Sequence, residues 1–151
     1  MLGCTKLSSN TDMIKLYSEK ILALATEIPF TACLSKPDVS ITKRSPVCGS
    51  MITIELVVRN GKIIEFSQNV KACALGQAAA AIVGDVIIGS SKSEIQLAHD
   101  QLKNMLTING QIPDKPFEKL EVLLPAKDYK NRHASIMLSF KALLAGLEKV
   151  N

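Results

Sequence analysis

The chain has 151 residues, of which 47% are hydrophobic, and its formal net charge is +4. This length and apolar content suffice for one sizeable core, so we predict a single domain over residues 1–151, with residues 1–10 flexible. No run of about 18 apolar residues would span a membrane, and the first ten residues lack the apolar core of a secretion signal, which predicts a soluble, cytoplasmic protein. The basic residues are mixed with acids and lack interleaved aromatics, which excludes nucleic acid as the expected partner.

The first predicted helix runs from about Thr11 to Ile28, where apolar side chains recur at helical spacing until Pro29 ends the pattern. Three runs of alternating apolar and polar residues follow, at 39–42, 52–58 and 64–70, and they predict half-buried strands. Asn60-Gly61 separates the second run from the third and predicts a two-residue hairpin turn, because both residues tolerate positive φ.

Helical patterns fill the second half of the chain. An alanine-rich helix is expected over 74–88, and Ser91 with Glu94 has the form of a capping box that begins the next helix, which Asn109-Gly110 ends. A loop containing Pro113, Pro116 and Pro125 leads to a last helix from about residue 131. Strands and helices are segregated along the chain, so we predict an α+β fold with a three-stranded antiparallel sheet packed against about four helices.

Four cysteines, at positions 4, 33, 48 and 73, are too sparse for a disulfide framework, which favours thiolate chemistry or metal binding. Cys48 and Cys73 are equally distant from the centre of the predicted turn, so an unbulged hairpin would place them opposite each other, with Cβ atoms about 4.5–5.5 Å apart. Gly49 allows close backbone approach to a bound ion, and Cys73 stands at a helix N-terminus, where the dipole favours thiolate. Cys4 and Cys33 have no ligand-like context.

Histidine supplies the candidate third ligand. His99 lies within the capping-box helix and is expected to be a solvated surface residue. His133 stands near the start of the last helix, directly after a proline-containing loop, and is the better ligand candidate. A site of Cys48, Cys73 and His133 would leave an open coordination position for water, sulphide or a ligand from a partner, and Asp128 or another oxygen ligand is an alternative occupant.

Three segments together resemble one known family. They are Val47-Cys48-Gly49-Ser50, Lys71-Ala72-Cys73-Ala74-Leu75-Gly76-Gln77-Ala78, and the stretch from Leu123-Leu124-Pro125-Ala126-Lys127 to His133-Ala134-Ser135. With the hairpin, they are similar to the U-type iron–sulphur cluster assembly scaffolds (IscU, SufU and the N-terminal domain of NifU). The resemblance extends from about Met13 to Lys149 and is strongest around the two cysteines.

The resemblance implies a scaffold that binds iron or a nascent [2Fe-2S] cluster, with zinc as an alternative metal, and that turns over no substrate. It implies a cysteine desulfurase as sulphur source, apo iron–sulphur proteins as recipients and a chaperone as a further partner. Cys48 and Cys73 match the family's first two cysteines. Ser50 stands where the family has aspartate, and the third cysteine is replaced by His133 or Ala134, depending on the placement of a gap.

These two departures leave three functions open. In the first, Cys48, Cys73 and His133 hold the cluster or its iron. In the second, a zinc-held thiolate, Cys73 or Cys48, accepts persulphide sulphur from the desulfurase. In the third, the chain is a structural zinc-binding interaction module.

Overall fold

The computed structural model describes residues 18–46 and 49–150. Its elements alternate little between helix and strand, and the strands are consecutive in the chain. In order they are α2 (Glu19–Thr26), β1 (Val39–Arg44), β2 (Met51–Arg59), β3 (Lys62–Lys71), α3 (Ala74–Val86), α4 (Lys92–Thr107), the 3-10 helix η1 (Glu118–Asp128) and α5 (Lys130–Lys149).

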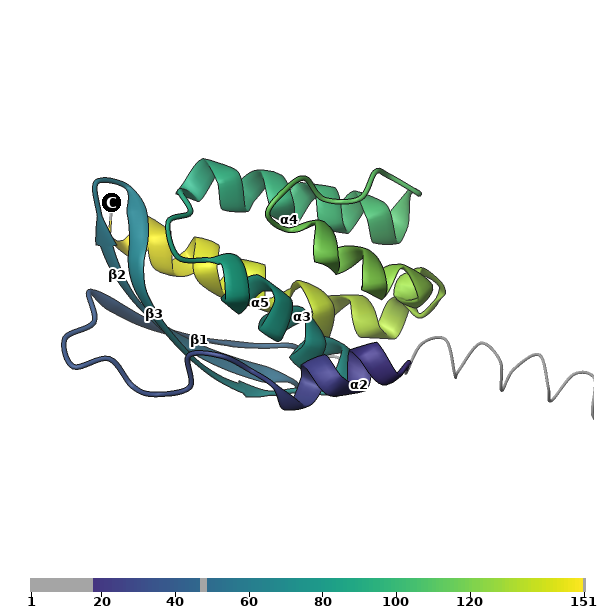
Figure 1. Cartoon of the computed structure of the whole chain (residues 1–151), viewed down its shortest axis with the longest axis horizontal. Helices are drawn as coiled ribbons and strands as arrows, with labels where there is room; N and C mark the ends of the chain where they lie inside the picture. Colours follow the sequence, from purple (N-terminus) through teal and green to yellow (C-terminus); the bar gives the residue numbers. More distant parts are fainter. Residues whose placement is uncertain (1–17, 47–48, 151) are drawn as a thin grey trace, which may run out of the picture.

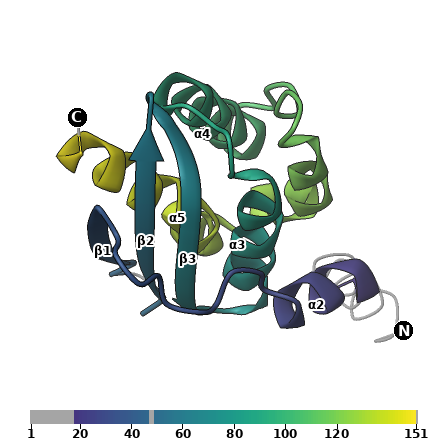
Figure 2. The ribbon, with the colours of Figure 1, turned by 60° about the vertical axis from the view of Figure 1, so that its left-hand side comes forward.

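The three strands form one antiparallel sheet in the order β1-β2-β3, and the helices α3, α4 and α5 lie on the same side of it (Figure 1). Helix α5 packs against β1 and β2, α3 contacts β3, and α4 packs on α5 farther from the sheet (Figure 2). The predicted α+β fold with a three-stranded antiparallel sheet is therefore confirmed.

The hairpin between β2 and β3 turns at the predicted residues. Asn60 and Gly61 both have positive φ, 55° and 74°, and the flanking residues Arg59 and Lys62 pair with each other. This backbone conformation matches the twist of the two strands, as in the primed turns that favour Asn-Gly. The predicted two-residue turn is confirmed.

The first helix is described only in part. Residues 11–17 of the predicted segment lie outside the described residues, and α2 begins after Ser18, whose hydroxyl accepts a hydrogen bond from the Ile21 N–H at 3.3 Å. Ile21 and Ala25 are buried, and the helix ends three residues before Pro29.

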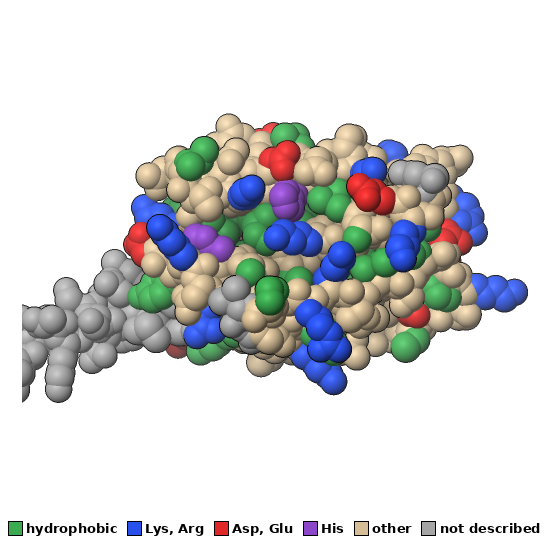
Figure 3. Space-filling model, turned by 180° about the vertical axis from the view of Figure 1, so that it is seen from behind, with side chains coloured by type: hydrophobic (Ala, Val, Ile, Leu, Met, Phe, Trp, Pro, Cys, Tyr) green, Lys and Arg blue, Asp and Glu red, His purple; other side chains and the backbone are tan. Residues whose placement is uncertain are grey.

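Helix α4 begins and ends where the sequence predicts. The Glu94 N–H donates to Ser91 Oγ at 3.3 Å, and the Ser91 N–H donates to Glu94 Oε1 at 3.0 Å, which completes the capping box. These bonds hold the pKa of Glu94 below its ordinary value. Asn109, just beyond the helix, has a φ of 56°. Helices α4 and α5 each contribute one of the two histidines, and both lie on the face shown in Figure 3.

The predicted proline-containing loop was only partly correct, because residues 118–128 form the 3-10 helix η1. Its buried side chains, with Phe117 just before it, recur every third residue, the period of a 3-10 helix. They are Phe117, Leu120, Leu123 and Ala126.

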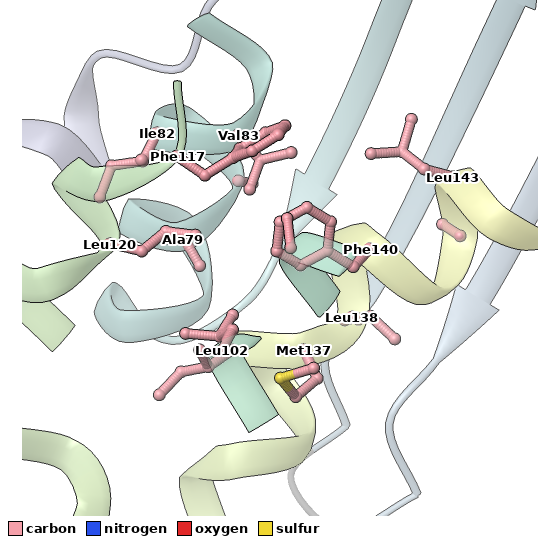
Figure 4. Close-up of a cluster of buried hydrophobic side chains, with 14 of the residues drawn as sticks. Ala79, Ile82, Val83, Leu102, Phe117, Leu120, Met137, Leu138, Phe140 and Leu143 are labelled. Carbon is pink, nitrogen blue, oxygen red and sulfur yellow. The ribbon is translucent and has the colours of Figure 1, made fainter. Parts of the chain in front are cut away.

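The core lies between α3, α5 and the inner face of the sheet and continues outward to α4 and η1. Phe117 and Phe140 meet edge to face at its centre, with ring centroids 5.5 Å apart (Figure 4). Both side chains are buried, and Leu102 and Leu120 are buried in the same cluster. Across residues 18–46 and 49–150, no helix has both the length and the apolar character that a membrane span needs.

Candidate functional site

Cys73 stands between the sheet and the helices. Strand β3 ends at Lys71, and Cys73 is the N-cap residue of α3, with extended backbone angles of φ −65° and ψ 168°. Its carbonyl accepts the first helical hydrogen bond, from the Gln77 N–H at 2.9 Å, while its thiol caps no backbone N–H. The side chain is partly buried against the core. The sulphur is thus positioned by the strand-to-helix junction, as the sequence predicts.

Two serine hydroxyls lie next to this thiol. Cys73 Sγ is 3.6 Å from Ser135 Oγ, and Ser135 Oγ is 2.9 Å from Ser50 Oγ. Both serines are 2% exposed, so this chain of polar atoms is almost closed to solvent. It joins three elements that are distant in sequence, because Ser50 directly precedes β2, Cys73 caps α3, and Ser135 lies in α5.

Ser135 is a site residue that the sequence analysis missed. Helix α5 approaches α3 so closely at this point that a Cβ at Gly76 would overlap Ser135 Oγ. The signal available in the sequence was the pattern of apolar and small polar residues along α5. Ser135 and Ser139, one turn apart, interrupt an otherwise apolar buried stripe, and small polar residues in such a stripe indicate close contact with a neighbouring element.

Cys48 lies outside the described residues, but its neighbours define the loop that carries it. The Gly49 N–H donates to the Ser45 carbonyl at 3.0 Å, and the Ser45 N–H donates to the Ser50 carbonyl at 2.8 Å. Gly49 has a φ of 71°, in the left-handed region that favours glycine. The backbone after Cys48 therefore needs the glycine that the motif supplies.

The predicted unbulged register of the hairpin was wrong. Val57 pairs with Glu65 but Val58 pairs with Ile63, so Ile64 is an extra residue on β3. The bulge shifts the rest of the ladder by one position, and Met51 pairs with Lys71. The ladder ends at this pair, and Cys48 lies outside the described residues, so whether the two cysteines lie opposite each other stays a prediction.

The side chain of His133 has different neighbours from that of Ser135. Its Nε2 is 2.9 Å from the carbonyl oxygen of Ala126. A carbonyl only accepts, so Nε2 carries the hydrogen and Nδ1 holds the lone pair of the neutral ring. The imidazole lines two cavities between α4, η1 and α5, and Cys73 lines neither of them. The ligation of a metal by His133 stays a prediction.

His99 is less exposed than a solvated surface residue, with its side chain only 15% exposed. Its Nδ1 lies 2.9 Å from Asp100 Oδ1, and this hydrogen bond is the main cause that holds the pKa of Asp100 below its ordinary value. His99 lines one of the two cavities that contact His133. The expectation of a solvated His99 was therefore wrong, because the side chain turns into the seam between α4 and α5.

The described residues contain no cluster of three or more His, Cys, Asp or Glu side chains that would hold a metal. Around Cys73 the described polar side chains are hydroxyls, which are weak ligands for soft metal ions. Within this part of the chain, the site offers one thiol as a strong ligand or nucleophile, and a second thiol at Cys48 is three residues from β2 in sequence.

No family model matches the chain. The chain is 34% identical to a nitrogen-fixing NifU-like protein (N-terminal) from Brucella abortus, whose crystal structure matches with a TM-score of 0.89 over 92% of this chain and 96% of that one. The chain belongs to the U-type scaffold family. The family resemblance predicted from the cysteine motifs is thereby confirmed.

Two further relatives of this U-type chain carry scaffold names. The iron–sulphur cluster assembly scaffold protein IscU of Thermotoga maritima is 25% identical over 136 residues, which are 90% of this chain and 95% of the relative. A putative iron–sulphur cluster assembly scaffold protein for the SUF system from Fervidobacterium islandicum AW-1 is 21% identical, with a TM-score of 0.80 over 89% of this chain and 98% of that one. This last likeness concerns the fold.

Proposed function

We propose that this U-type protein is a scaffold on which iron and sulphide are assembled into a [2Fe-2S] cluster before transfer to apo-proteins. The observation that supports it is the position of Cys73, partly buried at the N-terminus of α3 and connected through Ser135 to Ser50, which is two residues from Cys48 in sequence. Thiolates are the usual ligands of iron–sulphur clusters, and a cargo that must leave benefits from an incomplete ligand set. Sulphur would come as persulphide from a cysteine desulfurase and would be reduced to sulphide by two electrons from a thiol reductant or an electron-transfer protein, and the chain itself would turn over no substrate.

In this proposal Cys48 and Cys73 are the two thiolate ligands, with His133 as the proposed third. Ser135 and Ser50 would border the cluster and supply hydroxyl hydrogen bonds to sulphide or thiolate. Hydrogen bonds to the sulphurs tune a cluster's reduction potential, so these hydroxyls give the site a chemical role even without direct ligation.

Anaerobic reconstitution with iron, cysteine and a cysteine desulfurase tests the proposal, with the cluster measured by visible absorption and acid-labile sulphide. We expect a chromophore in the wild-type protein that is lost in Cys48→Ser and in Cys73→Ser. Cys33→Ser is the matched control, because Cys33 is also a free cysteine but is exposed outside the site. His133→Ala in the same series tests the third ligand. Stoichiometric zinc without labile sulphide in the wild type would contradict the scaffold.

A second function, sulphur acceptance, is favoured by the free thiol of Cys73, which lies only partly buried at the N-terminus of α3. One thiolate is enough for this chemistry. The Cys73 thiolate would attack the outer sulphur of the desulfurase persulphide, the donor's S–S bond would break as a new S–S bond forms on Cys73, and the donor cysteine would leave as thiolate. No net oxidation occurs. Mass spectrometry after incubation with desulfurase and cysteine, without iron, would then show one added sulphur atom in wild type and none in Cys73→Ser.

A further inference from the structure

The seam between α4 and α5 is hollowed on the side away from Cys73. Two adjoining cavities, with volumes of about 290 Å³ and about 530 Å³, share Leu106, Thr107 and His133. The smaller cavity continues past His99 and Lys103 of α4, and the larger one opens toward η1. Because they share lining residues, the two cavities form one trough, here called the α4–α5 trough.

The trough follows the two helices. Its lining residues on α5 are Lys130, His133, Ala134, Met137 and Lys141, spaced three, one, three and four apart, which is one helical stripe. Lys130 and Lys141 are eleven residues apart, which is about 16 Å along a helix at about 1.5 Å per residue. An extended peptide of about five residues, at about 3.3 Å each, spans this distance.

The charge of the trough is strongly positive. Four lysines and one aspartate line it, and they are Lys103, Lys127, Lys130, Lys141 and Asp128. All four lysines are exposed, and no ion pair within residues 18–46 and 49–150 includes any of them. Figure 3 shows lysine and arginine side chains around both histidines on this face. Lys127 donates to Asn109 Oδ1 at 3.4 Å and Lys103 acts electrostatically on Asp100, so the trough presents a net positive charge that is only partly compensated.

The floor of the trough is apolar. Leu106 and Met137 are 3% and 6% exposed and lie between the basic rims. A methionine floor adapts to aliphatic side chains of different shape. A ligand that matches both features carries several negative charges around at least one apolar group.

We propose that the α4–α5 trough binds an acidic, extended segment of a partner protein, with an aliphatic side chain over Leu106 and Met137. The chain's own residues 1–17 do not match, since they carry two lysines and one aspartate. A second copy, with a net charge of +4, matches poorly as well. Among residues 18–46 and 49–150, no aromatic or arginine side chain lines the trough, so this part of the chain gives it no stacking platform of the kind found in single-stranded nucleic-acid sites.

This inference goes beyond cluster assembly and does not depend on it, because the trough excludes Cys73. It also gives His133 and His99 a role as hydrogen-bonding groups in the trough. Their imidazoles lie along the path between the lysines, where a carboxylate or backbone carbonyl of the peptide would pass.

Fluorescence anisotropy tests the proposal, with the full chain titrated into a labelled peptide that has two glutamates on each side of one leucine. We expect saturable binding at low salt that weakens at least about fivefold in Lys103→Glu/Lys141→Glu, since each reversed charge replaces an attraction by a repulsion. Lys43→Glu is the control, because Lys43 is equally exposed but lies on β1. Replacing the peptide's leucine by glycine should also weaken binding.

Several results would overturn the assignment. They are no binding to wild type, equal loss in Lys43→Glu, or no effect of the leucine replacement. Inorganic phosphate or an oligothymidine that displaces the peptide at equal charge concentration would assign the trough to free anions or nucleic acid instead. Because the experiment contains no iron or sulphide, its failure leaves the scaffold proposal untouched.

Discussion

A methyl group at Gly76 is expected to disrupt the contact between α3 and α5 that places Ser135 beside Cys73. A Cβ at this position would overlap Ser135 Oγ and would lie 2.9 Å from Ala72 Cβ and 3.3 Å from the Ser135 carbonyl oxygen. The side-chain oxygen can rotate away, but Ala72 belongs to the junction between β3 and α3, and the Ser135 carbonyl belongs to the backbone of α5. Gly76→Ala therefore forces either a side-chain rearrangement at the site or a shift of α5.

Two opposing effects determine how much Gly76→Ala changes the free energy of unfolding. Overpacking a well-packed contact costs about 1–3 kcal/mol, whereas alanine in place of glycine within a helix contributes about 0.5–1 kcal/mol. We expect Gly76→Ala to lower the free energy of unfolding by about 1–2 kcal/mol. Gly146→Ala in α5 is the matched control, because its Cβ would meet only the ends of side chains, with Leu56 Cδ1 at 3.1 Å and Ile54 Cδ1 at 3.4 Å. It should be near neutral or stabilising.

Urea unfolding followed by far-UV circular dichroism measures both variants, and a double-mutant cycle with Ser135→Ala locates the cost. If Ser135 Oγ is the main obstacle, Gly76→Ala should be less destabilising in the Ser135→Ala background, with a coupling energy of at least about 0.5 kcal/mol. A Gly76→Ala protein as stable as wild type, or a coupling energy of zero, would refute this account of the α3–α5 contact.

Four further predictions follow from the same structure. Phe140→Ala should lower the free energy of unfolding by about 3–5 kcal/mol in urea, because its fully buried ring leaves a cavity; a loss below about 1 kcal/mol would contradict its central position. Ser91→Ala should cost about 1 kcal/mol through the lost α4 cap, and an unchanged urea midpoint would contradict the cap. The Val58 N–H donates to Asp38 Oδ2 at 2.8 Å and is the main cause that lowers the pKa of Asp38 from 3.8. The ionised Asp38 carboxylate therefore stabilises the fold fully above about pH 4, and this stabilisation is lost as the pH falls through the lowered pKa. Acid titration of stability should accordingly be shallower in Asp38→Asn, and parallel curves would exclude this link. Ser135→Cys should add a third thiolate, so a reconstituted cluster should pass more slowly to an apo-ferredoxin, and faster transfer would argue against its position at the site.

In the hairpin between β2 and β3, the sequence predicted the turn but not the bulge. Asn60-Gly61 predicted the turn, because few other residue pairs accept two positive φ angles. The bulge escaped prediction because Ile63 and Ile64 are adjacent and both apolar, so the alternating pattern fits either register. Only packing distinguishes them, with Ile63 fully buried and Ile64 46% exposed. The register predicted for the two strands was therefore wrong by one residue, while the position of Cys73 relative to Cys48 stays a prediction because Cys48 lies outside the described residues.

The 3-10 helix η1 was not predicted from the sequence, for a different reason. Prolines at 113, 116 and 125 predicted an irregular loop, and an α-helical pattern is absent from this segment. The period of three in Phe117, Leu120, Leu123 and Ala126 was present in the sequence, but such long 3-10 segments are uncommon. Packing of these four side chains against α3 and α4 stabilises a helix type that has poor hydrogen-bond geometry on its own.

The candidate site was predictable as far as Cys73, because the switch from strand to helical pattern places that residue at a junction. The third member, His133, stays a prediction, whereas the contact of Ser135 with the thiol escaped the sequence, and helical geometry relates the two residues. Successive residues turn about 100° around a helix, so His133 and Ser135 face nearly opposite directions on α5. Ser135 contacts the Cys73 sulphur while His133 hydrogen-bonds to the Ala126 carbonyl, so ligation of the Cys73 site by His133 would require this hydrogen bond to break and the imidazole to turn. Chemistry at the thiol and recognition in the α4–α5 trough are thus placed on two sides of one helix, where substitutions can separate them.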